Sequence, residues 1–160
     1  MKSVVIYYSY SGNTQKVADI LAKLLAEKGE VERIELVGLD EAKTFLGQAK
    51  RALFRKRAAI QPVSFDLSGY DLICFGTPVW AFAPAPAINT YLDKCFGLEN
   101  KNVILFATFG SGTGKERCLN YMQKILAKKG IKQCKRFSIQ QFKVSDGEFV
   151  SKVLVEMMRL

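Results

Sequence analysis

The residues best suited to bind a ligand are the hydroxyl-bearing side chains of one short stretch, Ser9-Tyr10-Ser11-Gly12-Asn13-Thr14. This stretch carries no charged side chain and separates an apolar run from a long amphipathic pattern. Backbone N–H groups at a helix N-terminus, together with the helix macrodipole, favour a bound phosphate. The hydroxyls would add further donors. The alternative is an ordinary strand-to-helix turn in which Ser and Asn cap the helix.

The elements on either side of this stretch form the first unit of an alternating fold. Residues 2–8 read as a buried strand, because Val4 to Tyr8 form a continuous apolar run. From Val17 to Leu25 the apolar residues recur at helical spacing, and Gly29 marks the helix end. Residues 31–37 read as a shorter strand, so a right-handed crossover should join two parallel strands.

The rest of the chain repeats this alternation. Further strands are expected at 70–76, 102–108 and 131–139, and the last is more polar and therefore suits a sheet edge. Further helices are expected after Pro84 and Pro86, and at 115–129 and 148–159. We therefore predict an α/β three-layer sandwich: one domain over 1–160, with a five-stranded parallel sheet of order 2-1-3-4-5 and helices on both faces.

Composition excludes several classes of protein. The chain of 160 residues has no His, which removes imidazole as a catalytic base or metal ligand. Its four cysteines are widely spaced, so neither a metal site nor a disulfide is expected. No apolar run approaches the roughly 20 residues that cross a bilayer, and the first residues do not resemble a signal peptide. We expect a cytoplasmic protein.

Three loops should meet at one edge of the sheet. In doubly wound sheets a ligand binds beyond the carboxyl ends of the strands, where strand order reverses. The segments at this edge are 9–14, 77–82 and 108–114. The second offers Trp80, the only tryptophan, beside Pro78, and the third is rich in glycine, so its backbone can approach a ligand closely. Together they predict a site for an anionic tail and a flat aromatic ring.

These residues resemble those of the flavodoxin family. Tyr8-Ser9-Tyr10-Ser11-Gly12-Asn13-Thr14-Gln15 is similar to its flavin-phosphate loop, and Gly76-Thr77-Pro78-Val79-Trp80 to the loop that sets an aromatic ring against the isoalloxazine. The segment from Phe106 to Gly112 corresponds to the loop at the pyrimidine end. The resemblance covers nearly the whole chain and implies a flavodoxin-like fold, FMN as cofactor and electron transfer as the activity.

The resemblance also implies a role for each loop residue. The phosphate would be bound by Ser9, Ser11, Gly12, Asn13 and Thr14, with Tyr10 alongside. The ring would be flanked by Thr77, Pro78, Val79 and Trp80, with Trp80 stacked on it, and held at its pyrimidine edge by Thr108, Phe109, Gly110 and Gly112. The alternatives are that Trp80 is a half-buried core aromatic and that Phe109 serves ordinary packing. No catalytic residue and no metal ligand is expected.

Competing phosphate motifs fail on particular residues. The segment from Phe109 to Lys115 resembles a P-loop, but Phe109 occupies the first glycine position and Glu116 replaces the Ser or Thr that binds Mg²⁺. The dinucleotide fingerprint fails because Lys115 stands at its third glycine position. A response regulator needs acidic residues after the first strand, and residues 7–11 contain none.

Two features depart from the flavodoxin pattern. Many flavodoxins have glycine in the second loop, where a peptide flips toward the flavin N5, but residues 79–82 contain no glycine. Flavodoxins are also usually acidic, whereas this chain has 24 basic and 15 acidic residues, a net charge of +9. Either its redox partner is acidic, for example ferredoxin-like, or the protein is not a freely diffusing carrier.

The basic segment 43–57, within a helical pattern over 40–60, is where we expect that difference in charge to act. It has a helical pattern, and residues 43–57 carry six Lys or Arg and no acid. Such a face can simply be solvated, or it can dock on an acidic partner or an anionic membrane surface. No base-reading motif suggests a specific nucleic acid.

Three functions remain open. The first is an FMN electron carrier, a monomer or weak dimer that shuttles electrons between redox partners. The second is an FMN-dependent NAD(P)H:quinone or acceptor oxidoreductase on the same fold. The third is a module that has lost its flavin, for which a damaged phosphate loop would be the mark, and here that loop is intact.

Overall fold

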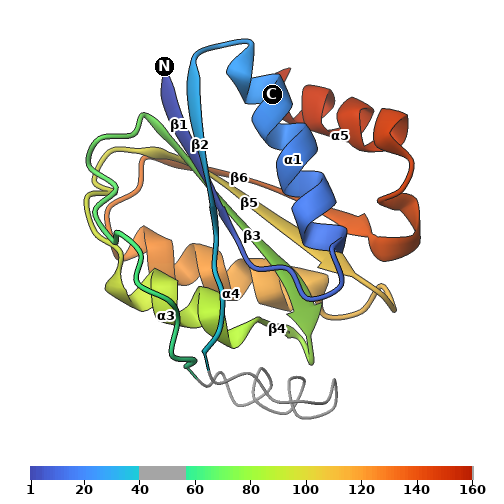
Figure 1. Cartoon of the computed structure of the whole chain (residues 1–160), viewed down its shortest axis with the longest axis horizontal. Coiled ribbons are helices and arrows are strands. Elements are labelled where there is room, and N and C mark those ends of the chain that lie inside the picture. Colours follow the sequence, from blue (N-terminus) through green and yellow to red (C-terminus); the bar gives the residue numbers. More distant parts are fainter. Residues whose placement is uncertain (40–56, 160) are drawn as a thin grey trace.

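The computed structural model describes residues 1–39 and 57–159, and its sheet follows the expected strand order. Five parallel strands are arranged as β2-β1-β3-β5-β6 (Figure 1). Their bounds are β1 (Lys2–Tyr7), β2 (Glu30–Glu35), β3 (Leu72–Trp80), β5 (Asn102–Phe109) and β6 (Gln133–Gln140). A sixth strand, β4 (Ala83–Pro84), pairs antiparallel with β3. The predicted order 2-1-3-4-5 is thus confirmed for the parallel strands, and β4 is an addition to it.

Helices cover both faces of this sheet, as expected for a three-layer sandwich. One face carries α1 (Asn13–Ala26) and α5 (Gly147–Arg159), and the other carries α3 (Pro86–Lys94) and α4 (Lys115–Ala127) (Figure 1). A short 3₁₀ turn, η1 (Gln141–Lys143), follows β6. The longest of these helices has 14 residues, and no helix among the described residues could cross a bilayer.

The two-residue period of β1 divides the core into two layers. Val4 and Ile6 pack with the α3 and α4 side, whereas Val5 and Tyr7 pack with α1 and α5. All four are at most 3% exposed. Because successive strand side chains point to opposite faces, a strand buried on both faces favours apolar residues at successive positions, as from Val4 to Tyr7. Each such side chain contributes roughly 1.5–3 kcal/mol when fully buried.

The third strand differs from its expected bounds. It begins at Leu72 rather than Tyr70 and continues to Trp80, so residues 77–80 are strand and not loop. The reason is β4: Val79 pairs with Pro84 and Trp80 with Ala83, which extends the ladder beyond the parallel part of the sheet. The connection is only the two residues between Trp80 and Ala83.

The predicted helix over 40–60 falls mostly outside the described residues, which exclude 40–56. Its last residues are described, and they are not helical. Ile60 instead forms an antiparallel bridge with Gly38, and the backbone N–H of Leu39 donates to the carbonyl of Ala59 (2.8 Å). This end of the prediction was wrong because the chain here pairs with the segment after β2.

Candidate functional site

A cavity of about 590 Å³ opens at the carboxyl edge of the sheet, beside the point where strand order reverses between β1 and β3. Its size is typical of small-molecule and cofactor sites. Its walls come from the β1–α1 loop, the ends of β3 and β5, and the start of η1. The lining residues are Tyr10, Ser11, Asn13, Thr14, Pro78, Val79, Trp80, Ala81, Thr108, Phe109, Gly110, Ser111 and Gln141. None of these carries a charge.

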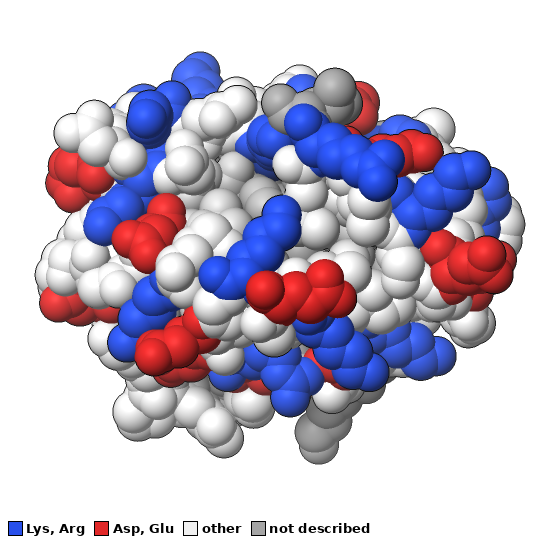
Figure 2. Space-filling view, turned by 90° about the horizontal axis from the view of Figure 1, so that it is seen from above, with Lys and Arg blue, Asp and Glu red and all other residues white. Residues whose placement is uncertain are grey.

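A second cavity, of about 180 Å³, lies at the opposite end of the sheet, where Leu72, Asn102 and Gln133 begin their strands. Figure 2 looks onto the molecule from this end and shows basic and acidic side chains interspersed around it. It is smaller, and it lies at the amino ends of the strands, where parallel sheets do not bind their ligands. The larger cavity is therefore the candidate site.

The β1–α1 loop ends in a backbone arrangement that exposes helix N–H groups. Gly12 occupies the N-cap position of α1 with a left-handed φ of 84°, and its carbonyl accepts the Lys16 N–H (3.1 Å). No acidic residue lies in the first turn of α1. The Ser9 hydroxyl accepts the Gln15 N–H (3.2 Å), and the Asn13 amide donates to the Ser11 hydroxyl (3.1 Å). A left-handed residue without a side chain is what lets this loop turn tightly into the helix.

The first turn of α1 is tied to the end of β5 by one buried hydrogen bond. The Thr14 and Thr108 hydroxyls lie 2.8 Å apart, and the two residues are 1% and 4% exposed. Either hydroxyl can donate in this pair. If Thr108 donates, the Thr14 proton is free to point at a ligand in the cavity. The pair thus joins two of the three predicted loops across 94 residues of sequence.

The aromatic side chains of the cavity differ from the expectation in their exposure to solvent: Tyr10 is the exposed ring, and Trp80 is buried. Trp80 is 5% exposed and meets Tyr8 and Tyr10 edge-on, with ring centroids 5.5 and 5.7 Å apart. Tyr10 also lines the cavity but is 46% exposed. Trp80 therefore belongs both to the core and to the cavity wall, and its position on a strand rather than a loop corrects the sequence-based expectation. Its stacking on a bound ring stays a prediction.

The β3–β4 connection is a two-residue hairpin turn with unusual backbone angles. Ala81 and Phe82 both have positive φ, 46° and 67°, a conformation that hairpin turns normally assign to Gly, Asn or Asp. Phe82 packs so closely on Gly114 that a Cβ there would lie 2.3 Å from the Phe82 ring. Strain of this kind persists only where the surroundings enforce it, and it often marks a functional site. Here it shapes the wall that Ala81 presents to the cavity.

The third loop is held by residues that the sequence analysis did not select. The Gln140 side-chain amide donates to the Gly110 carbonyl (2.9 Å), and Gln141 lies against Gly110, where an added Cβ would be 3.2 Å from its amide nitrogen. Gln141 and Ser111 also line the cavity. The one available signal was topological: β6 ends at the same edge of the sheet as the other loops.

Not every predicted site residue lines the cavity. Ser9, Gly12, Thr77 and Gly112 are absent from its walls, whereas the other ten predicted residues form them. The Thr77 hydroxyl accepts the Ala85 N–H and donates to the Pro78 carbonyl, both at 2.9 Å, and so orients the end of β3. Ser9 and Gly12 shape the β1–α1 loop, and Gly112 adopts a left-handed φ of 82°. Ser9 and Thr77 thus act through their hydroxyls, whereas the two glycines act through their backbone angles.

The cavity combines three features: uncharged hydroxyl groups at a helix N-terminus, aromatic side chains, and a position where the strand order of a parallel sheet reverses. This combination is that of a flavodoxin-like nucleotide-binding domain. Residues 1–143 match the family model described as NADPH-dependent FMN reductase, and the chain belongs to that family. That description names FMN, the cofactor expected from the sequence, together with NADPH. The sequence resemblance to flavodoxin-like proteins is thereby confirmed.

Individual relatives agree with this assignment. The curated protein named Probable flavodoxin 2 from Bacillus subtilis (strain 168) is 28% identical over 114 residues, which span 69% of this chain and 60% of that protein's length. A flavoprotein in complex with FMN from Lactobacillus acidophilus NCFM shares the fold with a TM-score of 0.69, at 24% identity, over 92% of this chain and 98% of its own.

Two further solved structures share the fold. Oxidised flavodoxin 1 from Bacillus cereus has a TM-score of 0.67 at 20% identity and covers 99% of this chain and 98% of its own. An NADH:FMN oxidoreductase in its apo form has a TM-score of 0.69 at 21% identity and covers 99% of this chain and 87% of its own. Similarity at this level extends to a protein named flavodoxin and to one named NADH:FMN oxidoreductase, and it shows the fold alone.

Proposed function

We propose that the chain folds as one domain that binds FMN and serves as an electron-transfer protein between redox partners. The observation that carries this proposal is the composition of the larger cavity. Its lining combines Ser11 of the β1–α1 loop and Asn13 and Thr14 of the first turn of α1 with the aromatic rings of Tyr10 and Trp80. A phosphate monoester joined to a flat ring system matches this division between polar and aromatic surfaces.

The described residues fit FMN without a cation in the cradle. A phosphate gains from helix N–H groups and the macrodipole, and three neighbouring side chains supply further donors. Gly110 and Ser111 bring backbone polar groups to the opposite wall, and Gln141 adds an amide that can both donate and accept. These residues would meet the pyrimidine edge of the ring, which also carries donors and acceptors.

The side chains in this site would position the flavin ring and shield it from water, and they would not react themselves. Bound FMN supplies reversible uptake of one or two electrons. Trp80, Val79 and Pro78 exclude water from one side of the cavity, while the uncharged lining disfavours an added negative charge there. The site should therefore lower the potential at which the ring accepts its second electron. Potentiometry of Trp80→Ala tests this, and an unchanged potential would count against it.

A second candidate function has its own support. The family description names NADPH, and one structural neighbour is an NADH:FMN oxidoreductase. On this alternative the protein oxidises NAD(P)H and reduces a quinone or another small acceptor. A steady-state assay of NADPH oxidation with a quinone separates the two. We expect slow turnover in that assay, and rapid turnover would favour the reductase.

The remaining expectations complete the proposal. We propose a cytoplasmic protein that is a monomer or weak dimer. We further propose that its redox partner is acidic, of ferredoxin-like character, because the chain carries a net charge of +9.

The decisive experiment for the proposed function is a visible spectrum of the purified protein after incubation with FMN and removal of the excess, followed by reduction with dithionite.

A further inference from the structure

Three exposed aromatic rings line the larger cavity or adjoin its lining residues in sequence. Tyr10, Phe82 and Phe142 are 46%, 43% and 68% exposed, and they come from three different segments. Tyr10 lines the cavity itself, while Phe82 follows the lining residue Ala81 and Phe142 follows the lining residue Gln141. Single exposed apolar residues scattered over a surface are normal in proteins. Three large exposed rings carried by segments that line one cavity are instead typical of an interaction surface.

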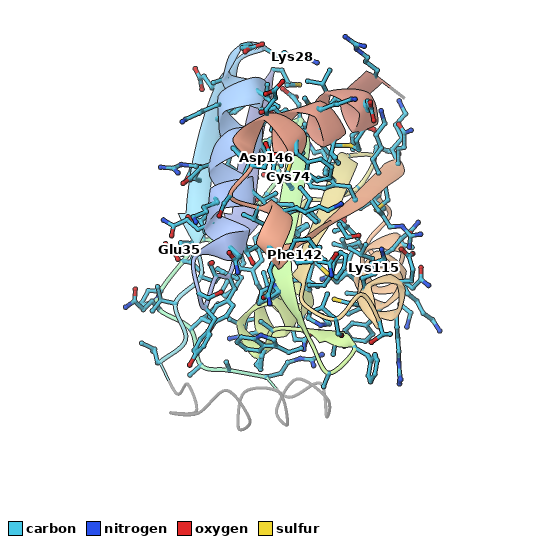
Figure 3. The ribbon with its side chains drawn as sticks, turned by 90° about the vertical axis from the view of Figure 1, so that its right-hand side faces the viewer. Lys28, Glu35, Cys74, Lys115, Phe142 and Asp146 are labelled. Atoms are coloured by element: carbon cyan, nitrogen blue, oxygen red, sulfur yellow. The ribbon has the colours of Figure 1, made fainter. Side chains whose placement is uncertain are left out.

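Cationic side chains stand beside these rings. The Lys115 ammonium lies 4.6 Å from the centroid of Phe109, which lines the cavity, and the Arg117 guanidinium lies 6.0 Å from the centroid of Phe82. Lys143 follows Phe142 in η1, and its ammonium lies over the ring of Phe149 in α5, 5.0 Å from the centroid. Figure 3 shows Lys115 and Phe142 in the half of the molecule nearer β4, at the end opposite Lys28.

These cations lack acidic partners within the described part of the chain. The ion pairs there join Arg33 to Asp19, Arg57 to Asp93 and Arg136 to Glu116, and none involves Lys115, Arg117 or Lys143. Glu116, the acidic neighbour of Lys115, is thus engaged by Arg136 (3.7 Å). At the opposite end of the sheet, both signs of charge are mixed on the surface (Figure 2). Lys115 and Arg117 are therefore available to an approaching molecule.

We propose that this rim, made of Tyr10, Phe82, Phe142, Lys115 and Arg117, is the docking surface for an acidic redox protein. The inference rests on the proposed electron-transfer function and assigns it a location. Cationic side chains without acidic partners steer an acidic protein toward the surface and raise its association rate. Exposed aromatic rings supply contact area once water is displaced. Docking at the mouth also brings the partner's redox centre next to the cavity, where electron transfer needs it.

The test uses the full-length protein and a plant-type [2Fe–2S] ferredoxin, an acidic redox protein, as the probe. The double variant Lys115→Glu, Arg117→Glu reverses the charge at the rim. The matched control, Lys128→Glu, Lys132→Glu, makes the same change in net charge at exposed residues beyond the other end of α4. For the rings, Phe142→Ala is compared with Phe96→Ala, which removes another exposed ring, 57% accessible, that does not adjoin the cavity.

Association is measured by isothermal titration calorimetry at low and high salt, and FMN content by the visible spectrum. We expect the rim charge reversal to weaken association about tenfold or more at low salt, and Phe142→Ala to weaken it at every salt concentration, with both controls close to the parent. Equal losses in rim and control variants, or no association of the parent at low salt, would overturn the proposal. So would a rim variant that changes only the KM for NADPH, because the cations would then serve a nucleotide.

These outcomes are distinct from failure of the proposed function. If the protein holds no FMN but still binds ferredoxin with the same pattern of losses, the docking surface stands and the flavin function falls. If the protein binds FMN but the rim variants bind ferredoxin as the parent does, the flavin function stands and the docking surface is refuted.

Discussion

The buried hydrogen bond between Thr14 and Thr108 gives the sharpest prediction about the phosphate loop. Replacing either threonine with valine keeps the shape of the side chain but leaves the other hydroxyl without its partner, in a pair that is 1% and 4% exposed. Such an unsatisfied buried group costs about 1–3 kcal/mol. We therefore expect each single variant to lose about that much unfolding free energy, and the double variant to recover most of it because no orphaned hydroxyl remains.

The two single variants should lose similar stability, but they should differ in their affinity for FMN. Only Thr14 belongs to the first turn of α1, where the phosphate is proposed to bind. A hydrogen bond to a charged group contributes about 1.5–3 kcal/mol, so Thr14→Val should weaken FMN binding about 10- to 150-fold. Thr108→Val leaves the Thr14 hydroxyl free to donate and should change FMN affinity only a few-fold. Riboflavin, which lacks the phosphate, should bind the parent and Thr14→Val equally.

The assays are urea unfolding followed by circular dichroism for stability, and quenching of flavin fluorescence for affinity. The double variant should match Thr14→Val in FMN affinity while resembling the parent in stability. If Thr14→Val loses stability but binds FMN as tightly as the parent, Thr14 only joins the loop to β5, and its assigned role in holding the phosphate is refuted.

Three further predictions concern the core and the ionisable groups. Gly76→Ala would place a Cβ 2.1 Å from the Phe106 ring, which is itself stacked on Phe137, so we expect a loss of about 1–3 kcal/mol by urea unfolding, whereas Gly69→Ala, with open space around it, should match the parent. Burial, followed by the hydrogen bond to Glu32, raises the pKa of Tyr70 to about 12, above the usual 10, so its contribution to stability is present below pH 10 and is lost as pH rises toward 12. Tyr70→Phe should remove that part of the alkaline decline, and an unchanged profile would contradict the assignment. Burial raises the pKa of all four cysteine thiols, and only Cys134 is partly exposed, so a thiol reagent near pH 8 should modify Cys134 first and the other three only on unfolding.

The sheet and its binding edge could be predicted from sequence because their signals are local. Continuous apolar runs mark buried parallel strands, and Gly12 and the Gly-rich loop after β5 mark where the backbone must turn. Strand alternation with helices then determines the order, and the order places the loops at one edge. These are properties of residue type and spacing, which need no knowledge of contacts between distant residues.

The parts that could not be predicted depend on tertiary contacts. Positive φ at Ala81 and Phe82 has no signal in residue type, because the pairing of β4 with β3 and the close packing of Phe82 on Gly114 impose it. The burial of Trp80 follows from Tyr8 and Tyr10 closing around it. Gln140 and Gln141 were overlooked because a polar strand exit looks like any other loop until its side chains are seen against Gly110.

The most direct test of the central claim is a titration of flavin-free protein with FMN, following both flavin fluorescence and the emission of the single tryptophan. Trp80 lines the cavity, so a ring bound there should quench its emission in step with the flavin signal and saturate at one FMN per chain. Parent protein that leaves FMN fluorescence unchanged, with undiminished tryptophan emission at excess FMN, would contradict the assignment of this cavity as a flavin site.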